Sequence, residues 1–140
     1  MTPVLIDTGA WIAVIEPSDR FHRASAAHLE ELIRRRVPLV TTNYIVSETA
    51  TRLRYDSGLA TALRFRGQLE RSVATGRLRV AWVDEGSQKE AWAVLERYAD
   101  VALSMTDAVS AAVARSNKIT TVFGFDSDFR AIGFDLQPTM

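Results

Sequence analysis

Apolar residues gather in short blocks along the chain, and amphipathic stretches with helical spacing separate them. Four of the blocks have the length and residue types of buried strands. They are the ranges 3–7 (PVLID), 37–41 (VPLVT), 77–83 (RLRVAWV) and 120–124 (TTVFG). Strands that are apolar throughout and alternate with helices are typical of parallel sheets covered on both faces. The pattern therefore predicts an α/β fold with a mostly parallel sheet of four to five strands.

Helices are expected in the intervals between these blocks. The first half of the chain predicts a short helix from Thr8, a helix over 18–36 capped by Ser18 or Asp19, and a helix from Thr42 or Asn43 through Tyr55. The second half predicts a helix over 59–76 after a break at Gly58, a helix starting at Asp84, and an alanine-rich helix capped by Thr106. The third and fourth helices should form a hairpin. No linker or repeat interrupts the alternation, so residues 1–140 are expected to form one domain.

The composition narrows the classes of protein. The chain has 140 residues, 47% of them hydrophobic, and its 17 basic and 17 acidic residues cancel. A neutral chain does not coat nucleic acid by bulk charge. No apolar run approaches the roughly 18 residues of a membrane span, and the first residues lack the features of a signal peptide. We therefore expect a cytoplasmic protein without membrane association.

Four acidic residues follow strands or begin helices of the predicted fold. Asp7 ends the first strand, Glu48 lies in the first turns of the helix after the second, Asp107 begins the alanine-rich helix, and Asp126 follows the fourth strand. These positions share the carboxyl edge of a parallel sheet, where ligands bind in open α/β folds. We therefore expect the four side chains to converge.

Each of these acids alone has an ordinary explanation, such as a helix cap, a turn, or an ion pair between Glu48 and Arg52 four residues later. Clustered carboxylates, however, repel and raise one another's pKa unless a cation neutralises them. Oxygen ligands suit Mg²⁺ or Mn²⁺. The chain offers few suitable ligands for zinc, because it has no cysteine, and His22 and His28 do not share a helix face. The cluster indicates metal-assisted chemistry on an anionic substrate.

Glycine-rich phosphate loops, a dinucleotide fingerprint and a serine nucleophile elbow are all absent from the sequence. Four segments, in contrast, resemble the successive motifs of PIN-domain ribonucleases, particularly VapC-type toxins. They are VLIDTGAWIAV, TTNYIVSETATRL, SMTDAVSAAVARS and TTVFGFDSDFRAIGF. The resemblance spans nearly the whole chain in the family's order. It implies a PIN-like three-layer fold and a Mg²⁺- or Mn²⁺-dependent endoribonuclease that hydrolyses RNA, the toxin of a type II toxin–antitoxin system.

The resemblance also implies roles for individual residues. The matched positions are Asp7, Asp107 and Asp126 as direct or water-mediated metal ligands, Glu48 as ligand or water-orienting base, Asp128 as an auxiliary ligand, and Thr8, Asn43 and Thr106 as supporting groups. Similarity to VapC proteins further implies a homodimer and a cognate VapB-like antitoxin.

Two expectations concern surfaces and the core. Arg64, Arg66 and Arg77 are expected to flank the acids and contact the RNA backbone, although exposed arginines commonly only solvate a surface. The three tryptophans, Trp11, Trp82 and Trp92, are expected in the core.

The helical hairpin between positions 43 and 75 is a candidate dimer or antitoxin surface. Its apolar residues Tyr44, Leu53, Leu63 and Leu69 exceed what one sheet needs. Ordinary packing of these side chains is the alternative.

Three other classes are compatible with clustered acids. A receiver domain pairs acids near its first strand and places a lysine after its last, and neither feature is present. A haloacid-dehalogenase-like phosphatase has D-x-D after its first strand, where this chain has Asp7, Thr8 and Gly9. A non-catalytic PIN-fold module that binds RNA or protein remains open.

Overall fold

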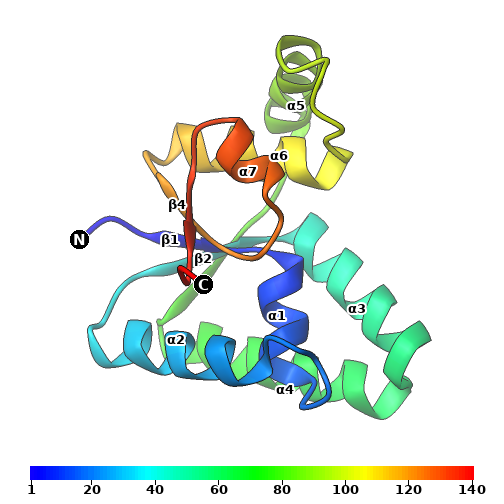
Figure 1. Ribbon diagram of the computed structural model, residues 1–140, viewed down its shortest axis with the longest axis vertical. Helices are drawn as coiled ribbons and strands as arrows, with labels where there is room; N and C mark the ends of the chain where they lie inside the picture. The colour runs from blue at the N-terminus through cyan, green and yellow to red at the C-terminus, as the bar shows by residue number, and fades with distance from the viewer.

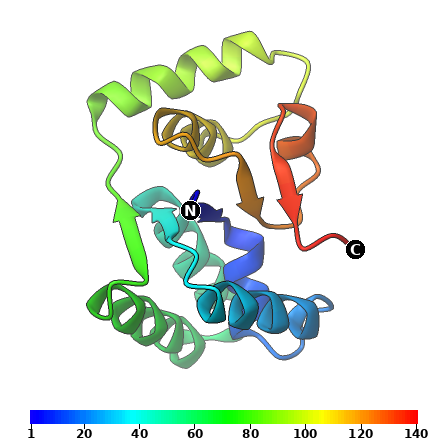
Figure 2. The same ribbon diagram turned by 90° about the vertical axis from the view of Figure 1, so that its left-hand side faces the viewer.

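The computed structural model describes residues 1–140 and shows a sheet between two layers of helices (Figure 1). The strands are β1 (Val4–Ile6), β2 (Leu39–Thr42), β3 (Leu78–Ala81), β4 (Thr121–Phe123) and β5 (Asp135–Gln137). The helices are α1 (Thr8–Ile15), α2 (His22–Arg34), α3 (Asn43–Ser57), α4 (Leu59–Ala74), α5 (Glu85–Arg97), α6 (Met105–Ser116) and α7 (Asp128–Ala131). Helices α1 to α4 cover one face and α5 to α7 the other (Figure 2). The predicted α/β, three-layer fold class is confirmed.

The sheet has five parallel strands in the order β3-β2-β1-β4-β5. The chain therefore moves outward from β1 to one side through β2 and β3, and then returns to the other side of β1 for β4 and β5. Val4 pairs with Leu39 of β2 and with Thr121 of β4. The reversal of order falls between β1 and β4, and such a switch point opens a crevice at the carboxyl ends of the strands.

Local sequence signals account for several helix boundaries. The Thr42 side chain caps α3 by accepting a 3.1 Å hydrogen bond from the Ile45 N–H, and Asp84 caps α5 by accepting a 2.8 Å bond from the Ser87 N–H. Gly58 takes a φ of 99° between α3 and α4, which a residue with a side chain rarely adopts. The predicted helical hairpin is confirmed.

Two predicted helix starts are wrong, and two short elements were not predicted. Helix α2 begins at His22, not near Ser18, because Asp19 caps the preceding turn instead, through a 2.8 Å bond from the Phe21 N–H. The cap of α6 is Ser104 rather than Thr106. Strand β5 and helix α7 were not predicted, because segments of three and four residues are too short to show periodicity.

The predicted burial is confirmed for one tryptophan and is wrong for the other two. Trp11 is buried, packs edge-on against Phe65 with ring centroids 5.4 Å apart, and donates a 3.3 Å bond to Thr41. Trp82 and Trp92 are 76% and 56% exposed. Trp82 follows the end of the edge strand β3, and α5 carries Trp92 on its outer side, so neither position has a layer to cover it.

The hairpin surface is also only partly as expected. Leu53 is 1% exposed and belongs to the core, whereas Leu63 is 43% exposed. Surface side chains of α3 and α4 enclose an apolar hollow of about 730 Å³ that includes Tyr55, Leu59 and Leu63. None of the seven helices combines the length and apolar character needed to cross a membrane.

Candidate active site at the carboxyl edge of the sheet

The four predicted acids lie at one edge of the sheet and come from four elements. Asp7 joins β1 to α1, Glu48 lies in the second turn of α3, Asp107 in the first turn of α6, and Asp126 in the loop after β4. Figure 1 shows this edge where α1, α3 and α6 begin and where the loop that follows β4 lies beside them. The negative charges act on one another, because Glu48, Asp107 and Asp126 all raise the pKa of Asp7.

Asp7 is the most buried of the four acids. Its side chain is only 6% exposed, and burial raises its pKa from 3.8 to about 7. The backbone amide of Thr8 acts against this rise, and the three neighbouring carboxylates add to it. Although Asp7 precedes α1 in extended backbone, its side chain makes no capping hydrogen bond. The carboxylate is therefore buried with only the Thr8 amide to stabilise its charge, and no cation of the protein compensates it.

Asp107 is held by the start of its own helix. Its Oδ2 accepts a 3.0 Å hydrogen bond from the Ser104 N–H, and the Ser104 hydroxyl accepts one of 3.0 Å from the Asp107 N–H. This reciprocal capping box fixes one carboxylate oxygen. Burial raises the pKa of Asp107, the bonds with Ser104 oppose that rise, and the charges of Asp126 and Glu48 reinforce it.

The loop after β4 is ordered by Asp126 itself. Its Oδ1 accepts a 2.9 Å bond from the Asp128 N–H, which starts α7, while the residue as a whole is exposed. One oxygen of Asp126 thus shapes the loop, and the other is left for a ligand. Asp128 is the first residue of α7 and only partly buried.

The predicted supporting residues take three different positions. Thr8 is buried beside Asp7, and its hydroxyl has no hydrogen-bond partner. Asn43 accepts a 2.7 Å bond from the Val83 N–H, which ties the start of α3 to the end of β3. Thr106 lies with Asn43 and Glu48 around an open hollow of about 410 Å³ between the starts of α3 and α6.

Sequence reasoning missed two features that position the acids. Gly124 lies directly against Asp7. Phe125 stacks on Phe21 of the turn between α1 and α2, with ring centroids 4.2 Å apart and planes 10° apart, and the Arg20 guanidinium covers Phe21 at 4.5 Å. The stack holds the loop before Asp126 against that turn. The alternation of phenylalanine and acid in FGFDSDF was the available signal.

The donor chemistry of this edge fits a hard divalent ion. All four acids offer oxygen, Asp7 is buried with only the Thr8 amide to stabilise its charge, and the neighbouring Thr8 hydroxyl lacks a partner. No three of the acids converge closely enough in this structure to hold one ion together. Since Glu48, Asp107 and Asp126 are all exposed or partly exposed, rotation of their side chains is the adjustment that binding requires.

The predicted RNA-contacting arginines lie elsewhere. Arg64 and Arg66 are on α4, where Arg64 donates a 3.4 Å bond to the Ile15 carbonyl and Arg66 lies 3.7 Å from Glu70. Arg77 precedes β3 and therefore lies at the amino edge, opposite the acids, because all strands run in parallel. The structure does not place these three arginines beside the acids.

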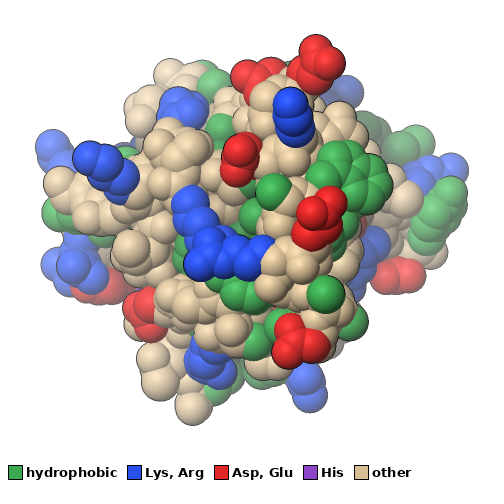
Figure 3. Space-filling model, turned by 90° about the horizontal axis from the view of Figure 1, so that it is seen from above, with side chains coloured by type: hydrophobic (Ala, Val, Ile, Leu, Met, Phe, Trp, Pro, Cys, Tyr) green, Lys and Arg blue, Asp and Glu red, His purple; other side chains and the backbone are tan.

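Glu48 has no ion pair with Arg52, so the ordinary surface role for this glutamate is absent. Acidic and basic side chains are mixed on the face shown in Figure 3, with no continuous field of one sign.

The family model of the PIN domain matches residues 4–135. The chain belongs to the PIN domain family. The carboxyl edge described above is thus the edge of a PIN domain, and the predicted family is confirmed. Comparison with curated proteins gives no significant match.

Several solved structures share the fold over nearly the full chain. The Mycobacterium tuberculosis toxin VapC20, described as cleaving the sarcin-ricin loop, is 28% identical with a TM-score of 0.79, over 94% of this chain and 95% of that one. DNA-bound VapBC from Salmonella typhimurium gives 17% identity and a TM-score of 0.68, over 98% of both chains. FitAcB from Neisseria gonorrhoeae gives 20% identity and a TM-score of 0.66, over 96% of both chains. The family match and the likeness to VapC20 support a nuclease of the toxin–antitoxin kind, and the two structures of lower identity show the shared fold.

Proposed function

We propose that this PIN domain is a Mg²⁺- or Mn²⁺-dependent endoribonuclease, the toxin of a toxin–antitoxin pair, and that residues 1–140 form one such domain. The observation that carries the proposal is the meeting of Asp7, Glu48, Asp107 and Asp126 at the carboxyl edge from four separate elements. A structural protein gains nothing from this arrangement, because mutual repulsion and burial of Asp7 destabilise the fold.

Each acid has a role in the proposed site. Asp7, Asp107 and Asp126 would hold the ion directly or through water, with Asp128 as an auxiliary ligand, while Glu48 would bind the ion or orient the attacking water. When bound, the ion would supply Lewis-acid polarisation of the phosphodiester and a lowered pKa for its water. Asp107 and Asp126 each reserve one oxygen for a backbone N–H, which fixes the direction of the other.

The supporting roles follow from the contacts. The buried Thr8 hydroxyl would donate to Asp7, the one strong acceptor next to it in the chain. Asn43 would hold the first turn of α3, and hence Glu48, through its bond to the Val83 N–H. Thr106 would shape the hollow that Glu48 lines.

Cleavage assays with purified full-length protein test this proposal. With Mn²⁺, the wild type should cut RNA of its own host, and ribosomal RNA is the first substrate to examine because VapC20 cleaves the sarcin-ricin loop. Asp107→Asn and Asp126→Asn should fold but lose cleavage, since each amide oxygen can keep its backbone hydrogen bond while the charge is removed. Asp135→Asn, an exposed change at the start of β5 and hence at the opposite edge of the parallel sheet, should cleave as the wild type does.

The second candidate function is a non-catalytic PIN module that binds RNA or protein. Failure of the wild type to cleave any host RNA, with both metals tested, would favour it. Binding of RNA by a protein that does not cut it would then identify the kind of module.

We also propose that a VapB-like antitoxin binds the apolar hollow between α3 and α4. Tyr55, Leu59 and Leu63 are 81%, 53% and 43% exposed there. Helix α3 lines this hollow and also carries Glu48, so a bound antitoxin would contact the same helix as the acidic site. The VapBC and FitAcB structures are complexes by name. Leu63→Asp should abolish copurification of the product of a neighbouring small gene, while Lys89→Asp on α5 should not. Unchanged copurification of Leu63→Asp would reject this surface.

A homodimer is a separate part of the proposal. Light scattering of the purified protein should give the mass of two chains, about twice the 15.6 kDa of one. The mass of a single chain at every protein concentration would reject the homodimer and leave the nuclease proposal unchanged.

A further inference from the structure

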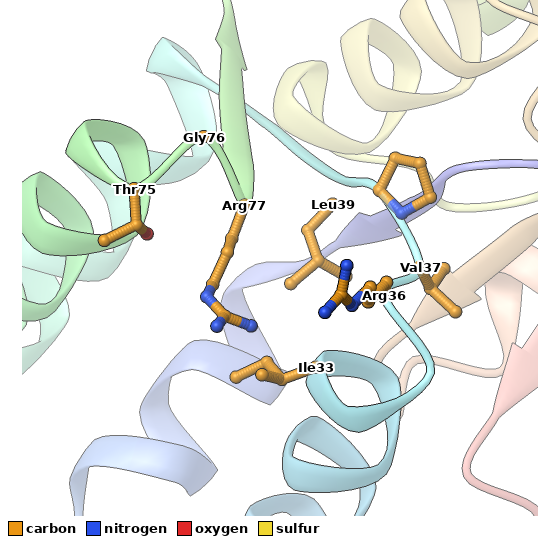
Figure 4. A pocket seen from close by; sticks show the side chains of 8 residues that line it. Ile33, Arg36, Val37, Leu39, Thr75, Gly76 and Arg77 are labelled. Carbon is orange, nitrogen blue, oxygen red and sulfur yellow. The ribbon is translucent and has the colours of Figure 1, made fainter.

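Arg36 and Arg77 lie at the amino edge of the sheet around a pocket of about 360 Å³. This edge is opposite the four acids. The floor of the pocket is apolar and formed by Ile33, Val37 and Leu39, and the two arginines are the only charged residues in its lining. Figure 4 shows both arginine side chains pointing into the pocket, one from each side of Leu39. The pocket thus combines an apolar floor with a purely positive rim.

Two matching turns build this pocket. Helices α2 and α4 both end in left-handed backbone, at Arg36 with φ 58° and at Gly76 with φ 75°. The chain then enters β2 and β3, which are adjacent and parallel, and the Leu39 N–H donates a 3.1 Å bond to the Arg77 carbonyl. Because neighbouring parallel strands begin at the same edge, the two turns and their arginines are brought side by side.

Neither guanidinium has a protein partner. The ion pairs of the structure involve other arginines, and neither Arg36 nor Arg77 makes a side-chain hydrogen bond. Two positive groups that face one hollow repel each other, and because Arg36 and Arg77 are both exposed, water weakens this repulsion without removing it. An anion between them would convert that repulsion into attraction.

The helix ends supply a simpler reason for one part of this arrangement. A positive side chain near the carboxyl end of a helix is favoured by the helix dipole. That effect accounts for an arginine at the end of α2 and another after α4. It does not account for both side chains turning into the same pocket over an apolar floor, when solvent on every other side would separate their charges.

We propose that this pocket binds a phosphate group. A guanidinium presents paired N–H donors that match two oxygens of a phosphate. Two guanidiniums on opposite sides of the pocket can therefore bind one phosphate together. The apolar floor formed by Ile33 and Leu39 suits the carbon side of a phosphate ester. The site is independent of the proposed nuclease, because no acid of the carboxyl edge lines it.

Amide NMR of the full-length protein tests this inference. Inorganic phosphate is titrated into metal-free protein with EDTA at constant ionic strength, with chloride as the reference anion. Saturable shifts are expected at the amides of Val37, Leu39, Gly76 and Arg77. EDTA removes any metal that would draw phosphate to the acids, so the result does not depend on the nuclease proposal.

Substitutions make the test specific. Arg36→Asn suits the left-handed backbone at this position, and Arg77→Gln keeps a polar side chain of similar length. Together they should lower phosphate affinity at least about tenfold, the order expected for lost charge-assisted hydrogen bonds. Arg35→Gln is the matched control, since it removes the same charge from the same helix end but does not line the pocket. Equal phosphate affinity in the double variant, the control and the wild type would overturn the proposal.

A second titration identifies the source of the phosphate. The probe is a short RNA oligonucleotide with methylated ribose hydroxyls, which resists cleavage. If the double variant loses affinity for both the oligonucleotide and inorganic phosphate, the pocket takes a phosphate of the RNA backbone. If it loses affinity for inorganic phosphate only, the pocket takes a free phosphate or a small phosphate ester. Shifts confined to residues outside the pocket would reject both.

Discussion

Gly124 lies directly against the side chain of Asp7. A Cβ atom added at position 124 would lie 3.1 Å from the Asp7 Cβ and 3.5 Å from its Oδ2. The first distance is shorter than ordinary van der Waals contact, and Asp7 is buried, so its carboxylate has little room to move away. The absence of a side chain at Gly124 therefore sets the position of the most buried acid of the site.

Gly124→Ala should disturb Asp7 more than it disturbs the fold. Since Gly124 does not have positive φ, alanine is compatible with its backbone, and the expected loss of stability is about 1 kcal/mol. Cleavage should fall by at least about tenfold, because small displacements of a catalytic group have effects of that size or more. Denaturant unfolding and cleavage rates are the measurements. Gly67→Ala on α4 is the control, and equal activity of the two variants would contradict the role of this contact.

The acid cluster predicts stabilisation by metal. Mg²⁺ or Mn²⁺ should raise the melting temperature of the wild type, because an ion that binds only the folded state stabilises it by mass action. Asp7→Asn should show a much smaller rise, since it removes the buried charge of the site. Thermal melts with and without EDTA measure the effect. The same rise in both proteins would show that the metal binds without Asp7.

Without metal, the stability of the wild type should fall as the pH rises from about 4 to about 7. Burial raises the pKa of Asp7 from 3.8 to about 7, so in this window the folded state holds a proton that the unfolded chain releases. The contribution of Asp7 over its full titration is on the order of 4 kcal/mol, because a tenfold change in acid dissociation corresponds to about 1.4 kcal/mol.

Urea unfolding in EDTA at several pH values measures this dependence. Asp7→Asn should be more stable than the wild type at pH 8, with the difference vanishing at low pH, because a protonated carboxyl and an amide are both neutral. A constant difference between the two proteins across the range would show that Asp7 titrates normally.

Ser104 should affect both α6 and Asp107. Ser104→Ala removes the hydroxyl that accepts from the Asp107 N–H and should cost about 1 kcal/mol of stability, as other lost helix caps do. Cleavage should also fall, because Asp107 then loses half of the capping box that orients it. Ser104→Thr keeps the cap and should restore both properties. A threonine variant as impaired as the alanine variant would indicate a role other than capping.

The predicted RNA contacts of Arg64 and Arg66 are best tested singly. Two positions apart on α4, they face different sides of the helix, since successive residues are rotated by about 100°. Charge reversal of a residue that contacts phosphate should weaken RNA binding and reduce the slope of log affinity against log salt by about one. Arg97→Glu on α5 is the control, and slopes equal to the wild type would show that the α4 arginines only solvate the surface.

The sequence by itself predicted most of the helices and strands, and it predicted that four acids lie at one edge of the sheet. Alternating apolar blocks and helical periods predicted the parallel sheet, and the caps at Thr42 and Asp84 followed from the local preference of short oxygen-bearing side chains for helix starts. The four acids were identified because positions at strand ends and helix starts share an edge in any parallel sheet. All of these inferences depend on residues close together in the chain, or on a rule common to the fold class.

Only the tertiary structure decided how those elements act on one another. The raised pKa of Asp7 depends on its burial and on the charges of three carboxylates that are distant in the chain, and no local pattern records it. Trp82 and Trp92 are exposed because no layer covers the outer side of β3 and α5, although tryptophan usually lies inside. Arg77 faces Arg36 across the amino edge because two strands separated by more than thirty residues begin side by side. Burial, charge coupling and pockets arise from contacts between remote segments, so they were set by packing and not by the local sequence.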